Sequence, residues 1–128
     1  MKTLISAAAA AGALLALASP SMAADASHGQ MLFKTQCGVC HQAGEGDGDG
    51  GQGPSLKGVV GRKIGGDENF SYTQVMMDDK DKWTQESLAA FLENPQKTIP
   101  GNAMPIRVGA PADRADIAAY LATVKAAP

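Results

Sequence analysis

Two cysteines three positions apart, followed at once by a histidine, constrain this chain more than any other feature. Cys37 and Cys40 are its only cysteines, and His41 comes next. C-x-x-C-H is the attachment signature of a c-type haem. Each thiol can add to one of the two vinyl groups of a haem, and the adjacent imidazole then lies under the iron. The motif therefore predicts a haem held by Cys37 and Cys40, with His41 as an iron ligand.

Three other interpretations of the cysteine pair are weaker. A thioredoxin-like dithiol belongs near a βαβ pattern, and no run of Val, Ile and aromatic residues predicts a strand here. A structural zinc site needs four ligands, and His28 is the only other histidine. A plain structural disulfide would not need His41.

The first 23 residues have the pattern of a secretory signal peptide. Lys2 precedes an uncharged run from Leu4 to Ser19, and small residues lead to Ala23. That run is shorter than the ~20 residues of a membrane-spanning helix, which disfavours an uncleaved anchor. We expect cleavage after Ala23, a signal peptide at 1–23 and one domain at 24–128. The mature protein is then periplasmic, with no stable membrane anchor.

Composition sets limits on the partners and on the core. The 128 residues suit a single domain. Eleven Lys and Arg against thirteen Asp and Glu give a net charge of −2, which argues against binding to nucleic acid. Three Phe, two Tyr and one Trp are few for a core. A flat apolar haem can supply the missing volume, so we expect folding to be coupled to haem attachment.

Local signals predict helices near both ends of the domain. Ser27 and Gln30 have the spacing of a capping box, which predicts a helix over about residues 27–38. Thr84 can cap a second helix that runs to about Asn94. These two segments are separated by a long, glycine-rich stretch.

A third helix is predicted at the C-terminal end. Pro111 suits its first turn, and four apolar residues follow at helical spacing, namely Ile117, Tyr120, Leu121 and Val124. Gly29 lacks a side chain and would let the first helix approach this apolar stripe closely.

Residues 42–53 form an acidic, glycine-rich stretch. Its acidic residues Glu45, Asp47 and Asp49 make a calcium site conceivable. However, the full calcium-loop consensus with its later Glu is missing. We therefore expect a solvated loop.

A haem in this protein needs either a sixth iron ligand or an open site. The candidates are His28, Met31, Met76, Met77 and Met104. The first two lie too close to Cys37 to reach the far face of the ring. Met104 lies in Pro100-Gly101-Asn102-Ala103-Met104-Pro105, a loop stiffened by prolines and far from Cys37 in sequence. Ligation by Met and His is an electron-transfer arrangement.

From about Gly29 to Leu121 the chain resembles the soluble class I cytochromes c, close to the mitochondrial type and its bacterial relatives. The resemblance implies a small all-α fold, with N- and C-terminal helices packed across each other around one covalently bound haem c. The shared motifs, in order, are Gly29 and Phe33, Cys37-Gly38-Val39-Cys40-His41, Gly53-Pro54-Ser55-Leu56, Gly58 to Gly61 with Arg62-Lys63, Phe70-Ser71-Tyr72-Thr73, Trp83, Leu92-Glu93-Asn94-Pro95, Ile99-Pro100-Gly101, Met104, and Arg114 with Asp116 to Leu121.

The resemblance also implies roles for individual residues. His41 and Met104 bind iron, while the carbonyl of Pro54 accepts a hydrogen bond from the outer nitrogen of His41 and so fixes its ring. Three further residues match positions near a haem propionate: Arg62, Tyr72 and Trp83.

Departures from the family pattern fall beside the methionine. The family often has Tyr at the position of Phe91, Asn at that of Met76, and Thr at that of Asn102. The first two changes remove polar groups and leave the iron–sulfur bond with fewer supports. Lysines of the haem edge are also replaced, by Met31, Gln36, Gln96 and Ala103, and Lys97 alone is retained. We expect weak electrostatic steering and docking through an apolar patch.

These features predict a monohaem electron carrier, not an enzyme, that acts as a monomer between periplasmic redox proteins. The resemblance implies a donor such as a cytochrome bc1-type complex or a dehydrogenase, and an acceptor such as a terminal oxidase or reductase. One alternative is a haem whose Met104 ligand leaves, giving a peroxidase or a binder of small gases. Another is the haem subunit of a larger dehydrogenase complex.

Overall fold

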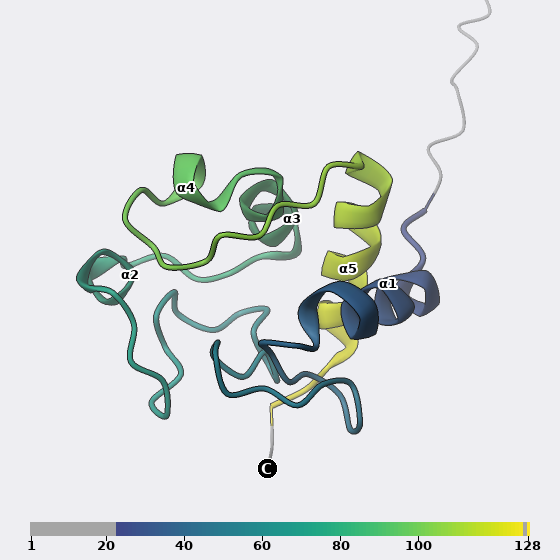
Figure 1. Cartoon of the computed structure of the whole chain (residues 1–128), viewed down its shortest axis with the longest axis horizontal. Helices are drawn as coiled ribbons and strands as arrows, with labels where there is room; N and C mark the ends of the chain where they lie inside the picture. Colours follow the sequence, from purple (N-terminus) through teal and green to yellow (C-terminus); the bar gives the residue numbers. More distant parts are fainter. Residues whose placement is uncertain (1–22, 127) are drawn as a thin grey trace, which may run out of the picture.

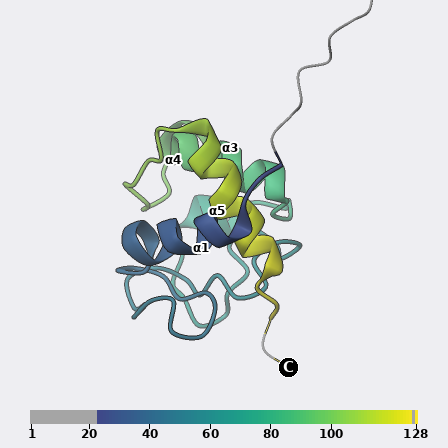
Figure 2. The same ribbon diagram turned by 90° about the vertical axis from the view of Figure 1, so that its right-hand side faces the viewer.

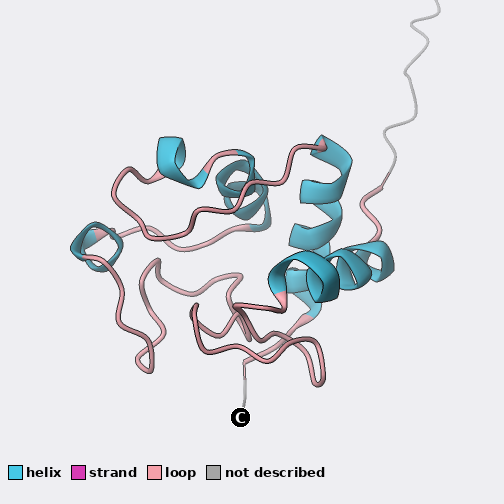
Figure 3. Cartoon of the chain, viewed as in Figure 1, coloured by secondary structure: helices cyan, strands magenta, loops and turns pink. Residues whose placement is uncertain are grey.

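The computed structural model describes residues 23–126 and residue 128, so the predicted signal peptide lies outside the described residues except for Ala23. Figure 3 shows helices joined by long loops. No strand forms within the described ranges, where a lone antiparallel bridge pairs Lys63 with Lys82. The helices are α1 (Ala26–Leu32), the π-helix η1 (Phe33–Cys37), α2 (Gln74–Asp78), α3 (Gln85–Glu93), α4 (Pro95–Thr98) and α5 (Pro111–Thr123).

The first and last helices cross at one side of the molecule, where α1 lies against α5 (Figures 1 and 2). Gly29 is buried at the crossing, and a Cβ there would overlap the carbonyl oxygen of Asp116. The predicted close approach is therefore confirmed. Nearby, the rings of Phe33 and Tyr120 pack with their centroids 5.7 Å apart. The predicted all-α fold, with its terminal helices packed on each other, is confirmed.

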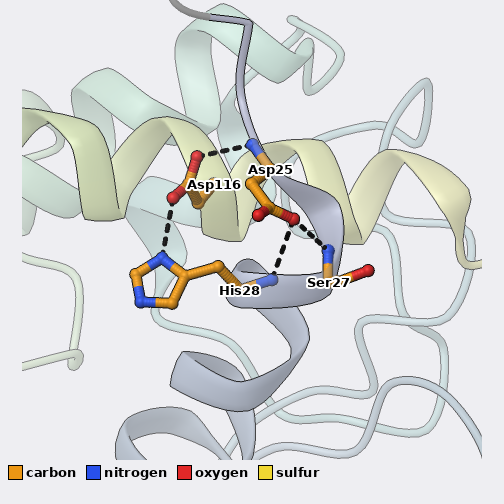
Figure 4. Close-up of polar contacts among 4 residues, drawn as sticks. All are labelled: Asp25, Ser27, His28 and Asp116. Carbon is orange, nitrogen blue, oxygen red and sulfur yellow. Dashed lines mark hydrogen bonds and ion pairs between the residues drawn. The ribbon is translucent and has the colours of Figure 1, made fainter.

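The start of α1 differs from the prediction. The N-cap is Asp25, whose carboxylate accepts hydrogen bonds from the backbone N–H of Ser27 at 2.9 Å and of His28 at 3.1 Å (Figure 4). The Ser27–Gln30 capping box was wrong because Gln30 turns to another partner, the carboxylate of Asp47. A carboxylate at this end of a helix also complements the helix dipole.

The predicted end of this helix, near residue 38, is confirmed, but the last part is not an α-helix. The α-helix ends at Leu32 and continues as the π-helix η1. The backbone N–H of Gly38 bonds the carbonyl of Phe33, five residues earlier, at 2.8 Å. Such wide turns are frequent at functional sites, and this one ends at Cys37.

The second predicted helix is confirmed as α3. Thr84 caps it, and the side chains of Thr84 and Ser87 each accept the other's backbone N–H. The helix ends at Glu93 because Asn94 caps α4 and Pro95 occupies the first position of α4. Its buried face carries Leu88, Phe91 and Leu92. The chain is thereby turned so that the segment after α4 runs back toward α5 (Figure 1).

The third predicted helix is confirmed as α5, with Pro111 in its first turn. Ile117, Tyr120 and Leu121 are buried, whereas Val124 follows the helix end and is half-buried. Together with Phe33 and the buried face of α3, this stripe forms the core. Within residues 23–126, no helix has the length and apolar character to cross a membrane.

Candidate haem-binding site

The cysteine motif lies directly after η1. The backbone N–H groups of Cys40 and His41 both bond the carbonyl of Cys37, at 3.0 and 2.9 Å, so the motif forms a tight turn. Both thiols are free and half-buried. Burial, helped by the nearby Cys40, raises the pKa of the Cys37 thiol to about 11, which keeps it protonated at neutral pH. The turn presents two unbridged thiols beside one imidazole, which fits the attachment chemistry of a haem.

The ring of His41 is held in one orientation. Its Nδ1–H donates to the carbonyl oxygen of Pro54 at 2.7 Å, which leaves Nε2 as the nitrogen that can bind a metal. Burial lowers the pKa of His41, while the Pro54 bond opposes that effect. Metal binding needs the neutral imidazole, which burial favours. Gly53 lies against the ring, and a Cβ at that position would overlap it.

The glycine-rich loop that leads to Pro54 does not match the prediction of a solvated loop throughout. The side chain of Asp47 is buried, with 1% of the residue exposed. Its carboxylate accepts from Gln30 Nε2 at 3.1 Å and pairs with Lys34 Nζ at 3.3 Å. Glu45 and Asp49 are exposed as expected. Residues 23–126 contain no group of three His, Cys, Asp or Glu side chains placed to hold a metal ion.

Arg62, Tyr72 and Trp83 are brought into one neighbourhood. The backbone N–H of Trp83 donates to the carbonyl of Arg62 at 2.9 Å. The Arg62 guanidinium donates to the carbonyl of Ser55 at 2.8 Å and also reaches the Tyr72 hydroxyl. That hydroxyl accepts from the backbone N–H of Asp67 at 3.2 Å, and burial raises the pKa of Tyr72.

Two polar atoms in this neighbourhood are buried without a hydrogen-bond partner in the described part of the chain. They are Nε of Arg62 and the hydroxyl of Thr73. A buried donor left unpaired costs about 1–3 kcal/mol, so each of these two donors suits an anion such as a carboxylate. The propionates of a haem are carboxylates, and these residues therefore fit that group. Sequence reasoning did not single out Thr73 as a candidate site residue, although the Phe70–Thr73 motif contains it.

Met104 lies in the loop between α4 and α5. It is half-buried and packs against the core. Its rivals are placed differently: Met31 and Met77 are 57% and 45% exposed, and Nδ1 of His28 bonds Asp116 at 2.8 Å. Met76 is half-buried beside the core. The segments that carry His41 and Met104 lie in different halves of the molecule (Figure 1).

Comparison with known proteins finds one family. A family model for cytochrome c matches residues 26–125. A cytochrome c2 from Rhodomicrobium vannielii is 41% identical over 113 residues, which is 87% of this chain and 88% of that protein. A cytochrome c from Tetrahymena pyriformis is 43% identical over 102 residues, or 78% of this chain and 89% of that protein.

The same similarity is found among solved structures. Cytochrome cH from Methylobacterium extorquens matches with a TM-score of 0.68 and 35% sequence identity. The match covers 77% of this chain and 98% of that structure. The arrangement of α1, the motif loop and α5 is thus shared with a class I fold.

Proposed function

Since the chain belongs to the cytochrome c family, whose members are electron carriers with one covalently attached haem c, we propose that it is a monohaem carrier with His41 and Met104 as the two axial ligands. Cys37 and Cys40 hold the ring. The observation that carries the proposal is the 2.7 Å hydrogen bond from His41 to Pro54. It occupies Nδ1 and so leaves Nε2 of the imidazole as the nitrogen that is free to bind iron.

The chain's own residues orient and shield the ring. When bound, the haem supplies an iron that changes between the ferric and ferrous states by one electron. Pro54 fixes the tautomer of His41. Arg62 and Thr73, whose buried Nε and hydroxyl lack partners among the described residues, would hold a propionate, and the Arg62 guanidinium would offset its charge. Tyr72 and Trp83 would complete this set. Met104 would hold the iron from its second side and keep water away from it, so that a change of oxidation state would need little rearrangement of the protein.

We further propose that the mature protein, residues 24–128, acts as a monomer in the periplasm after its signal peptide is removed. Its partners are redox proteins: a donor such as a cytochrome bc1-type complex or a dehydrogenase, and an acceptor such as a terminal oxidase or reductase. Exposed apolar side chains flank the haem-binding segments, with Val39 between the two cysteines and Ile106 just after Met104. These residues support docking through an apolar patch.

The test is the optical spectrum of the reduced holoprotein before and after addition of carbon monoxide. An unchanged spectrum is expected, because both axial positions are held. The variant Met104→Ala should then bind carbon monoxide readily. A clear shift in the wild-type protein at neutral pH would contradict ligation by Met104. It would favour the alternative of a peroxidase or gas binder. The buried Phe91, which has no hydroxyl, supports that alternative.

A further inference from the structure

The loop that carries Met104 is closed by one buried amide. Asn102 is 7% exposed, and its Nδ2 donates to the carbonyls of Pro95 at 2.8 Å and Ile99 at 2.7 Å. Its Oδ1 accepts the backbone N–H of Met104 at 2.8 Å. The side chain thus joins the first turn of α4 and the residue after α4 to the backbone of Met104 itself.

Only one orientation of the amide satisfies all of these partners. Two of them are carbonyl oxygens, which only accept, and the third is an N–H, which only donates. An amide has two N–H donors and one oxygen acceptor, and here each donor and the oxygen has a partner. A threonine, which is common at this position in the family, has a single O–H donor and cannot bridge the same three groups.

A second side chain reinforces the loop from outside. Nε2 of Gln96 donates to the carbonyl of Asn102 at 2.8 Å and to that of Met104 at 3.2 Å. Just before Met104 in the chain, the backbone N–H of Asn102 donates to the carbonyl of Ile99, and Gly101 adopts a φ of 91°. Pro100 and Gly101 therefore form the centre of a tight turn of type II pattern. Met104 is held on both sides through its own backbone.

The usual polar support on the sulfur side is missing. Phe91 is buried edge-on against Trp83, with ring centroids 5.1 Å apart, and offers no hydroxyl. Met76 is half-buried beside the core and offers no amide. The polar contacts of the Met104 loop are concentrated instead on its backbone.

We propose that Asn102 and Gln96 form a latch that keeps Met104 in place as an axial ligand, and so replace support that a polar network near the sulfur would give. Both are positioning residues, since they act through the backbone of Met104. The inference rests on the proposed ligation by Met104. It predicts that loosening the latch opens the sixth position while the fold and the haem attachment persist.

The test measures competition for the sixth position in the ferric holoprotein, with imidazole as the added ligand. Imidazole binds only when Met104 has left, so its apparent affinity follows the fraction of open molecules. Asn102→Ala removes three hydrogen bonds and should raise that affinity by about 10- to 100-fold, while Gln96→Ala should raise it by about 3- to 10-fold. The long-wavelength sulfur-to-iron charge-transfer absorption should weaken in parallel.

Two controls separate loop opening from general loss of stability. Asn69→Ala removes an exposed amide from another loop. Tyr120→Phe removes a hydroxyl that accepts from the backbone N–H of Gly44, a contact away from the Met104 loop. Both controls should keep the imidazole affinity of the wild type, although Tyr120→Phe should lower the melting temperature.

The outcomes are distinguishable. A wild-type protein without the sulfur-to-iron absorption would contradict ligation by Met104 and the latch with it, before any variant is made. A wild type with that absorption, and Asn102→Ala and Gln96→Ala variants with unchanged imidazole affinity, would overturn the latch and leave the proposed function standing. If Asn102→Ala fails to retain haem, the exposed Gln96 still decides the question.

Discussion

Individual polar side chains hold the loops of this protein, each through several hydrogen bonds. Asn102 uses two donors and one acceptor within the Met104 loop. Asp47 holds the glycine-rich loop as an acceptor: its carboxylate accepts from Gln30 and pairs with Lys34, both from the first helical segment. This loop in turn lies against the motif, because a Cβ at Gly48 would overlap the carbonyl of His41. The buried carboxylate of Asp47 therefore helps to hold the loop that packs against His41, the proposed iron ligand.

Replacing Asp47 with Ala should lower the free energy of unfolding by about 1–3 kcal/mol, because the Gln30 amide loses its partner at a buried position. Chemical denaturation of the ferric holoprotein measures the change. Asp49→Ala is the matched control, since this exposed acid lies two residues away in the same loop, and it should stay within about 0.5 kcal/mol of the wild type. Equal effects of the two substitutions would contradict a structural role for Asp47.

At the scale of elements, a small charged cluster joins the start of α1 to α5 (Figure 4). Asp116 of α5 accepts the backbone N–H of Asp25 at 2.7 Å and pairs with His28 at 2.8 Å. The hydrogen bond to Asp116 raises the pKa of His28, and Asp25 and Asp113 add to the effect. The hydrogen bond from His28 lowers the pKa of Asp116 in return. The cap of one helix is thus bound to the side of the other.

This pair should make the stability of the crossing depend on pH. Because the pKa of His28 is raised in the folded protein, the pair contributes its full stability below the ordinary value of 6.5. That contribution is lost as the pH rises through the pKa of the folded state. Because the pKa of Asp116 is lowered in the folded protein, its contribution to stability is complete above the ordinary value of 3.8. That contribution is lost as the pH falls through the pKa of the folded state. The contribution is therefore greatest between these limits. His28→Gln should lower the melting temperature of the holoprotein at pH 5 more than at pH 8.

Ser27→Ala is the matched control for this experiment. The Ser27 side chain is exposed, and its backbone N–H alone bonds Asp25. Its effect on the melting temperature should be the same at both pH values. A His28→Gln effect that is equally independent of pH would show that the ion pair contributes nothing to the crossing.

At the scale of the whole molecule, the helices alone enclose a modest core. The described chain has fourteen buried apolar residues, drawn from α3, α5, η1 and the loops between them. Long segments, including most of residues 38–73, have no helix (Figure 3). Cys37 and Met104 are only half-buried beside this core. We therefore expect a bound haem to supply apolar volume that this core lacks.

A haem-free Cys37→Ala, Cys40→Ala double variant should consequently lack a cooperative thermal transition. Small domains bury a limited share of their surface, and this one loses its central apolar group together with its covalent link to the chain. Circular dichroism during heating, compared with the holoprotein, makes the measurement. A sharp melt of the double variant would refute the coupling of folding to haem attachment.

Docking is also a property of the whole surface. Val39 and Ile106 are 68% and 46% exposed, and the neighbouring Gln36 and Ala103 are uncharged and exposed. Electron transfer to membranes of the cell that makes the protein should therefore change little as salt reduces the Debye length from about 30 to about 8 Å. A steep fall in the rate with ionic strength would contradict this.

A charge-matched pair of variants locates the docking surface. Ile106→Lys should slow the transfer, because it replaces an exposed apolar side chain of the proposed docking surface with a charge. Ala112→Lys adds the same charge at an exposed position of α5 and should leave the rate unchanged. Equal rates for the two variants would show that Ile106 lies outside the contact.

Much of this molecule is determined by sequence over short distances. The spacing of Cys37, Cys40 and His41 predicts haem attachment, because the chemistry needs two thiols and an imidazole close together in the chain. Thr84 and Pro111 mark the starts of α3 and α5 because capping and proline geometry act within a few residues of the chain. Local rules decide such features before any tertiary contact forms.

The partners of the polar side chains were decided only by the tertiary structure. Gln30 has the sequence spacing of a capping residue, yet it bonds Asp47; Asp25 meets Asp116, which is 91 positions away in the chain. Asp47 looks like part of a solvated glycine-rich loop and is buried. A polar side chain is stabilised by whichever group the folded chain brings within hydrogen-bond reach. That choice depends on how α1 crosses α5 and how the loops close, and the local pattern around each residue does not contain it.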